Sequence, residues 1–134
     1  MENVEPNYWA ILVAALSTFV IGGLWYSPAL FGKAWMKENG FTEEELRQGN
    51  MMKIFGLAFV LGLIAAVNLA MFIGPENNPV MGALWGFLAG AGWVATFVGM
   101  HYLFERKSFT LFLINAGYSI VSLTLMGVIL AAWK

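Results

Sequence analysis

Charged residues divide the chain into long apolar stretches. Four stretches contain no Asp, Glu, Lys or Arg, and they cover residues 6–32, 54–75, 77–104 and 108–133. Their lengths are 27, 22, 28 and 26 residues. An α-helix needs about 20 apolar residues to cross a bilayer core that is about 30 Å thick. The pattern therefore predicts four membrane-spanning helices.

The apolar stretches predict an all-α integral membrane protein built as a four-helix bundle. We expect the spans at about 7–26, 51–73, 80–104 and 109–133, in a single transmembrane domain that covers 1–134. The turn "GPENNP" joins the second span to the third, and "ERKS" joins the third to the fourth. Connections this short make the joined helices antiparallel neighbours.

The segment 28–50 is the one sizeable piece outside the predicted spans. Within it, "FGKAWMKEN" places Phe31 and Trp35 on one side of a short amphipathic helix and its lysines elsewhere. Such a helix suits the membrane surface, so we expect an interfacial helix between spans one and two. Gly40 is expected to end it, and Thr42 is expected to cap a second helix.

Composition supports the membrane interpretation. The chain is 60% hydrophobic and 11% charged, whereas a soluble domain has about 45–50% apolar and about 25% charged residues. A soluble fold of this length could not bury so much apolar surface. The chain has no cysteine, which excludes disulfides and thiol chemistry.

Basic residues are concentrated in two of the connections. Six of the seven lie between spans one and two or between spans three and four: Lys33, Lys37, Arg47, Lys53, Arg106 and Lys107. The segments "MENVEP" and "GPENNP" contain none. The positive-inside rule therefore predicts that 28–50 and "ERKS" are cytoplasmic and that both termini are outside.

Small residues recur at every fourth position in two predicted helices, which lets helix backbones approach closely in lipid. They are Ala58, Gly62, Ala66 and Ala70 in the second span and Gly82, Gly86 and Gly90 in the third, with Ala91, Ala95 and Gly99 on a neighbouring face. Each ladder can pack inside one bundle or against a second copy. Two ladders exceed what one buried seam requires, so we predict a homo-oligomer.

Polar side chains of three spans are expected at one depth near the inner end. His101 and Glu105 share a face of the third span, and Asn115 and Tyr118 share a face of the fourth. Trp25, Tyr26 and Ser27 end the first span on the same side. These seven residues are the candidate ligand-binding residues. They either form a hydrogen-bonded cluster that joins the helices or line a small pocket.

Each of these groups also has a simpler interpretation. Trp25 and Tyr26 fit an aromatic belt at the membrane boundary, and Glu105 fits a helix end beside basic residues. His101 and Glu105 could hold a metal or relay a proton, but two ligands are too few for a metal site. Asn68 lies nearer the outer side, where it is expected to form an interhelical hydrogen bond.

Several of these motifs together resemble a known family. "GLWYSPALFGKAW", "FTEEELRQGN", "LFE" and "LFLINAGYSIVSLTLMGVILAAW" are similar to the family called domain of unknown function 1761. The resemblance covers nearly the whole chain. It implies a four-span bundle in the bacterial inner membrane with no agreed activity. Its motif falls on Trp25, Tyr26, Ser27, Pro28, Phe31, Gly32, Trp35, Asn115, Gly117 and Tyr118.

Three functions are compatible with the sequence. The favoured one is a non-enzymatic protein, a homo-oligomer or an accessory subunit of a larger membrane complex, that binds lipid or a small apolar molecule in the inner leaflet. A small transporter or channel is an alternative, although span one has no carboxylate for proton coupling. A membrane enzyme using His101, Glu105 and Tyr118 is another. No residue is assigned a catalytic role, and no cofactor, metal or nucleic-acid partner is predicted.

Overall fold

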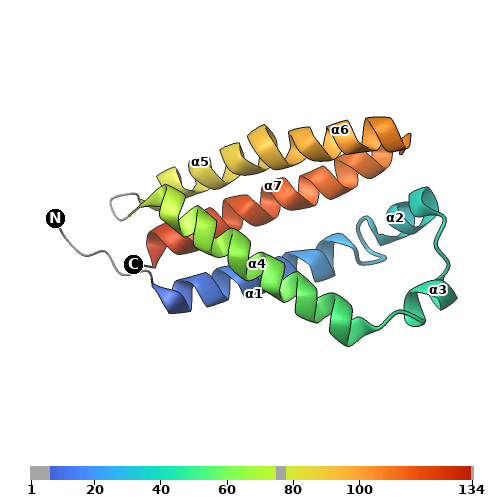
Figure 1. Ribbon diagram of the computed structural model, residues 1–134, viewed down its shortest axis with the longest axis horizontal. Helices are drawn as coiled ribbons and strands as arrows, with labels where there is room; N and C mark the ends of the chain where they lie inside the picture. The colour runs from blue at the N-terminus through green and yellow to red at the C-terminus, as the bar shows by residue number, and fades with distance from the viewer. Residues whose placement is uncertain (1–6, 75–77, 134) are drawn as a thin grey trace.

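A computed structural model describes residues 7–74 and 78–133, and the chain there is helical (Figure 1). The elements are α1 (Tyr8–Trp25), α2 (Gly32–Asn39), α3 (Glu43–Arg47), α4 (Met51–Ile73), α5 (Pro79–Ala89), the π-helix η1 (Gly90–Val94), α6 (Ala95–Glu105) and α7 (Phe109–Ala132). Four helices are long and apolar enough to cross a membrane: α1, α4, the continuous helix α5–η1–α6, and α7. The predicted all-α class and the four candidate spans are confirmed. All of "MENVEP" and residues 75–77 of "GPENNP", on which the orientation depends, lie outside the described residues.

Each long helix begins with a side-chain cap. The side chains of Asn7, Asn50, Asn78 and Ser108 accept from the backbone N–H three residues further on, at 2.9 to 3.2 Å. These caps satisfy backbone donors that have no partner within the helix. Thr42 caps α3 in the same way, and Gly40 ends α2 with a left-handed φ of 73°, so both sequence predictions are confirmed.

Helix α7 is the centre of the bundle. It packs against α1 on one side and against α5–η1–α6 on the other, while α4 packs mainly on α1. Figure 1 shows α4 crossing the bundle, so that it lies near α5 at the end where the chain termini lie and far from α6 at the α2–α3 end. We refer to these as the terminal end and the α2–α3 end.

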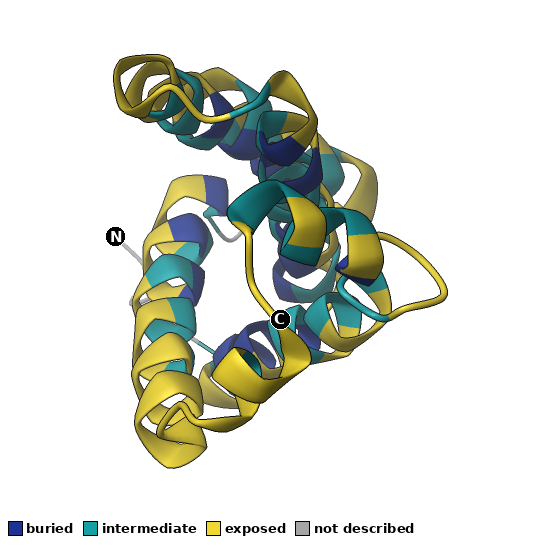
Figure 2. Ribbon diagram, turned by 90° about the vertical axis from the view of Figure 1, so that its right-hand side faces the viewer, coloured by how far each residue is buried: buried dark blue, intermediate teal, exposed yellow. Residues whose placement is uncertain are grey.

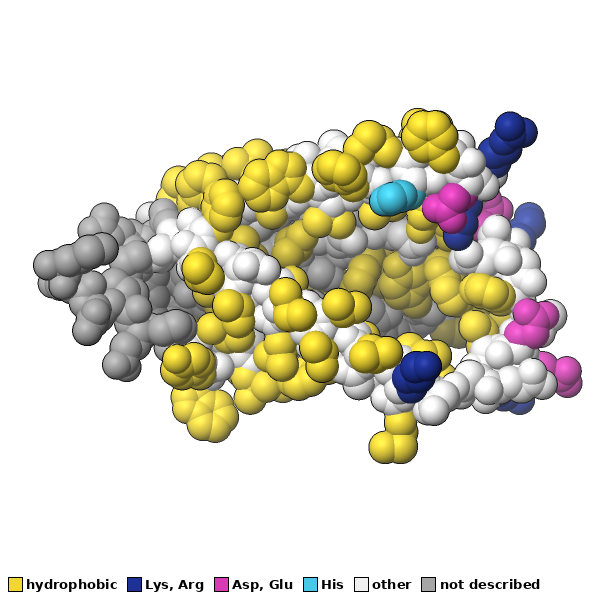
Figure 3. Space-filling model, viewed as in Figure 1, with side chains coloured by type: hydrophobic (Ala, Val, Ile, Leu, Met, Phe, Trp, Pro, Cys, Tyr) yellow, Lys and Arg dark blue, Asp and Glu magenta, His cyan; other side chains and the backbone are white. Residues whose placement is uncertain are grey.

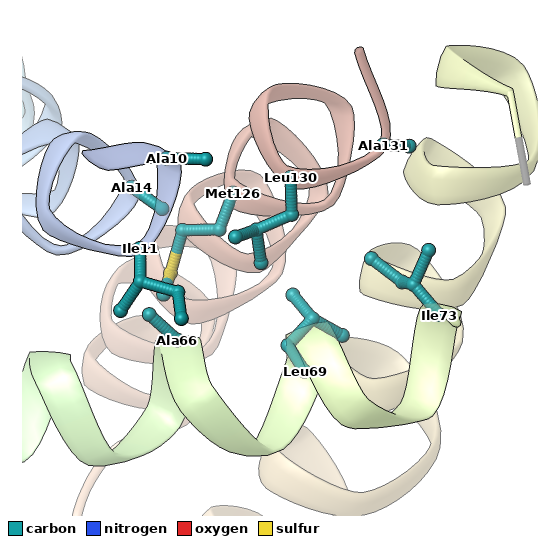
Figure 4. Close-up of a cluster of buried hydrophobic side chains, with 9 residues drawn as sticks. All are labelled: Ala10, Ile11, Ala14, Ala66, Leu69, Ile73, Met126, Leu130 and Ala131. Carbon is teal, nitrogen blue, oxygen red and sulfur yellow. The ribbon is translucent and has the colours of Figure 1, made fainter. Parts of the chain in front are cut away.

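The buried core lies at the terminal end. Its side chains come from the first turns of α1 and the last turns of α4 and α7, and they point toward one another (Figure 4). They are Ala10, Ile11, Ala14, Ala66, Leu69, Ile73, Met126, Leu130 and Ala131. Figure 2 shows buried residues where the helices face each other and exposed residues on the outer sides. Helix α4 is the least buried of the four spans.

Glycines form the seam between α5 and α7. A Cβ added to Gly82 or Gly86 would collide with the backbone carbonyl of Gly127 or Leu123, and one added to Gly90 would lie 2.8 Å from Ile120 Cα. These contacts bring the two backbones together, as small residues do in membrane helices.

The ladder on α4 lies on the α1 side. Gly62 lies near Ala15, Ala66 is fully buried in the core, and Ala58 is exposed. Both ladders therefore have contacts within one chain, although Ala58 of the α4 ladder is outside them. The homo-oligomer stays a prediction.

The π-helix changes which residues of the third span face α7. In an uninterrupted α-helix, Gly99 would point about 180° away from Gly90, because each residue turns the chain by about 100°. In the structure both glycines contact α7: Gly90 lies against Ile120, and a Cβ on Gly99 would lie 3.1 Å from the Phe112 ring. The wider turn of η1 holds one extra residue, which removes about 100° of this rotation and brings α6 back toward the same partner.

Candidate functional site

A hydrogen-bonded network joins the end of α1 to α6 and α7. The Tyr26 hydroxyl donates to Asn115 Oδ1 at 2.6 Å, and Asn115 Nδ2 donates to the Tyr102 hydroxyl at 2.6 Å. One amide thus connects two tyrosines from different segments. In a membrane interior such bonds hold helices together because unpaired polar groups are costly there.

Trp25 docks into α7 beside this amide. Its indole Nε1–H donates to the carbonyl of Ile114 at 2.8 Å. The ring lies over Gly117, where an added Cβ would be 2.9 Å from Trp25 Cζ2. Gly117 therefore leaves the space that the indole occupies, and the sequence pattern "NAGY" supplies both the amide and this space.

Tyr118 joins α7 to α1 one turn further along. Its hydroxyl donates to the Thr18 carbonyl at 3.0 Å, and its ring lies 5.4 Å from that of Tyr26. The Ser27 hydroxyl is used locally, since it donates to Leu24 O at 2.7 Å. The Trp25 indole, the Asn115 amide and the hydroxyls of Tyr26, Ser27 and Tyr118 thus all donate within the chain.

Aromatic stacking brings α2 back onto the network. Trp35 lies edge-on to Tyr26 at 5.7 Å and near Phe41 at 5.4 Å, while Phe31 lies 4.8 Å from Trp25. Gly32 opens α2 at a point where a Cβ would collide with the Tyr26 carbonyl. The "WYSPALFGKAW" turn is therefore folded tightly against α7.

Of the seven candidate residues, the network and the turn beside it contain Trp25, Tyr26, Ser27, Asn115 and Tyr118. His101 and Glu105 lie outside it: both are exposed, and neither forms a hydrogen bond with the described residues. The structure therefore does not join His101 and Glu105 to the network that contains Tyr118, whose hydroxyl donates to the Thr18 carbonyl. Within the described chain, no three His, Cys, Asp or Glu residues are grouped closely enough to hold a metal ion.

Sequence reasoning missed Tyr102, which provides the link from Asn115 to α6. Tyr102 is adjacent to His101 in sequence, so a plain α-helical projection puts the two residues on different faces. On the sequence alone, the face with His101 is placed in the candidate site. The rotation introduced by η1 decides which of them meets α7.

A cavity lies in the groove between α4 and α5–η1, with α7 at its base. Its volume is about 490 Å³, within the range of small-molecule sites. Its wall is formed by Ala65, Asn68, Leu69, Phe72, Trp85, Leu88, Ala89, Trp93, Val94 and Leu123. We call this the lateral cavity. Figure 3 shows this face of the molecule hollowed between α4 and the α5–α6 row.

Three aromatic rings form one part of the wall of the lateral cavity. The Phe72 ring of α4 lies 5.8 Å from Trp85 and 5.5 Å from Trp93, so it bridges α5 and η1. Trp93 and Val94 belong to the π-helix, a distortion that is frequent at functional sites. The sequence carried no signal for the cavity, because it depends on the angle at which α4 crosses the bundle.

These features define an all-helical protein with four helices suited to crossing a membrane, which is the construction of a multi-pass membrane protein. The chain belongs to the family described as "Protein of unknown function (DUF1761)", whose model matches residues 9–131. No curated protein and no solved structure matches it. The predicted family is thus confirmed.

Proposed function

We propose that this protein binds a small lipid-soluble molecule in the lateral cavity, as a membrane-embedded binding protein. The observation that carries the proposal is a cavity of about 490 Å³ with an almost wholly apolar wall, formed by three spans. Sites of this size with apolar and aromatic walls are typical of small-molecule binding. The groove opens sideways, so a molecule dissolved in the bilayer would reach it without passing through water.

The network around Asn115 has a different role in this proposal. The Trp25 indole and the Tyr26 and Tyr118 hydroxyls already donate within the chain, so in this proposal the network positions helices. By holding α1, α6 and α7 together at the α2–α3 end, it fixes one side of the groove while α4 leans away. The predicted ligand site thus moves from the inner-leaflet cluster to the groove between α4 and α5.

Photolabelling with a neutral aryl diazirine in nanodiscs tests the binding proposal. We expect saturable labelling of the cavity wall, found by mass spectrometry of peptides that contain Phe72, Trp85 and Trp93. Ala89→Phe fills the cavity and should abolish the saturable part. Ala58→Phe, the same change at an exposed position of α4, should leave it intact. Labelling that never saturates and spreads evenly over the apolar faces would exclude a binding site.

We further propose that the terminal end of the bundle faces outward and that α2 lies at the inner membrane surface. The support is the basic charge on α2, α3, the start of α4 and the α6–α7 turn, and Figure 3 places the Lys and Arg side chains of the visible face on its right-hand half.

Single cysteines test this orientation, because the chain has none of its own. In right-side-out vesicles a membrane-impermeant maleimide should label Tyr8→Cys, and it should label Gln48→Cys only after lysis. The reverse labelling pattern would invert the orientation and leave the binding proposal unaffected.

A further inference from the structure

Two polar groups in the wall of the lateral cavity have no partner. Asn68 is exposed on α4, and its amide forms no hydrogen bond with the described residues. Trp85 Nε1 is buried and has no acceptor. A free amide and a free indole N–H are both unfavourable in hydrocarbon, where water does not replace the missing partner.

The two groups lie at the same depth. Asn68 is five residues from the end of α4 at Ile73, which is about 8 Å along the helix axis. Trp85 is six residues from the start of α5 at Pro79, which is about 9 Å. The two helices run in opposite directions from the same end of the bundle, so both residues belong to one level of the wall.

The chemistry of these groups restricts the occupant. An indole N–H only donates, and an Asn amide donates through Nδ2 and accepts through Oδ1. A carbonyl oxygen has two lone pairs, so it can accept from both residues at once. The residues of the wall are uncharged, which gives no counterion to an ionised ligand.

We infer that the occupant of the lateral cavity is a neutral molecule with an apolar body and a carbonyl group, whose oxygen accepts from Asn68 Nδ2 and Trp85 Nε1. This inference depends on the proposed function, because it names the chemistry of the molecule bound there. The Trp85 N–H is covered in this structure, so the inference requires that the Trp85 side chain rotate to bring this N–H to the cavity. Phe72, tilted against that ring at 5.8 Å and more than half exposed, is the side chain that would move aside when Trp85 rotates.

A carbonyl in a membrane has two sources. It is either the ester of a glycerolipid or the carbonyl of a free ketone or quinone. Nanodiscs of ether-linked phospholipid contain no carbonyl, whereas ester-linked ones do, so the two sources are separable. Two added probes complete the design: a long-chain methyl ketone and the alkane of equal chain length.

The first measurement is the indole N–H signal of Trp85 in ¹⁵N-labelled protein, assigned by its loss in Trp85→Phe. In ether-lipid nanodiscs we expect the ketone to shift it downfield and the alkane to leave it in place. A downfield position in ester-lipid nanodiscs before any addition identifies the lipid ester as the source. A signal that stays the same in both lipids and with both probes overturns the inference.

The second measurement is competition against the diazirine label. We expect Asn68→Leu to lower the affinity for the ketone by about five- to tenfold, the effect of one hydrogen bond, and to leave the affinity for the alkane unchanged. Equal competition by ketone and alkane in the unaltered chain would overturn the carbonyl inference and leave the binding site standing. If neither the ketone nor the alkane competes with the label, both the carbonyl inference and the proposed binding site are wrong. A dimer that disappears in Asn68→Leu would also overturn it, since the amide would then be paired with a second copy.

Discussion

Tyr26 and Asn115 are 89 residues apart in the chain and share a hydrogen bond of 2.6 Å. Tyr26 follows the last residue of α1, and Asn115 lies in the second turn of α7. Because Asn115 also donates to Tyr102, its amide connects the end of the first span to the third and last spans of the bundle.

Removal of the Tyr26 hydroxyl is expected to weaken this connection. Tyr26→Phe should lower the free energy of unfolding by about 1 kcal/mol, because the Asn115 carbonyl loses its donor in a half-buried site. Unfolding by sodium dodecyl sulfate from mixed micelles measures the change. Tyr8→Phe, at a tyrosine that is 73% exposed, serves as the control and should have no effect. Equal stability of the two variants would show that the bond contributes nothing.

The glycine seam gives a second prediction. Gly86→Ala should destabilise the bundle by about 1–3 kcal/mol, because the new methyl group meets the Leu123 carbonyl and pushes α5 from α7. Gly56→Ala is the matched control, since a Cβ there has nothing within 4 Å. The same unfolding assay compares them. If both variants behave alike, the close approach of α5 and α7 is wrong.

The π-helix gives a third prediction. Deletion of Gly92 should convert η1 to an α-helical turn and leave α6 facing α7, because a π turn holds one residue more than an α-helical turn. Tyr102 would then stay beside Asn115, so Tyr102→Phe should cost about 1 kcal/mol in the deletion variant, as it does in the original chain.

Gly92→Ala keeps the chain length and is the control for that deletion, because a Cβ at Gly92 has nothing within 4 Å. In its background Tyr102→Phe should retain its full effect. Loss of the Tyr102→Phe effect in the deletion variant, with the effect kept in Gly92→Ala, would show that η1 does not hold one extra residue that sets the orientation of α6.

The exposed pair on α6 is expected to be dispensable for folding. His101→Ala and Glu105→Ala should each change the free energy of unfolding by less than about 0.5 kcal/mol, as is usual for surface positions. Tyr118→Phe, which removes the donor to Thr18, should cost about 1 kcal/mol in the same assay. A large loss in His101→Ala would mean that the histidine has a partner that this arrangement does not give it.

Much of the fold is readable from local sequence. Four charge-free stretches predict four apolar helices because the requirement for length is imposed by the bilayer. The pairing of Tyr26 with Asn115 could be predicted from the sequence, since both lie at the same end of adjacent spans and both need a polar partner. Caps such as Thr42 and stops such as Gly40 follow from backbone chemistry alone.

Other features depend on geometry that local sequence does not encode. "GAGWV" has the composition of any small-residue helix, yet its π turn decides that Tyr102 and not His101 meets α7. The lateral cavity exists because α4 leans toward α1 and away from α6, and that tilt is the sum of many weak contacts. Asn68 was expected to pair with a neighbouring helix, and the structure leaves it unpaired in the cavity wall.

The side-chain amide of Asn7 donates to the backbone oxygen of Trp133 at 2.9 Å, so the first and last described turns touch. Because the number of spans is even, the first and last helices begin and end on the same side of the bundle. Two copies could therefore be joined tail to head by a brief linker, and each would insert with the same polarity. In such a tandem, a substitution could be made in one copy while the other copy keeps the original sequence.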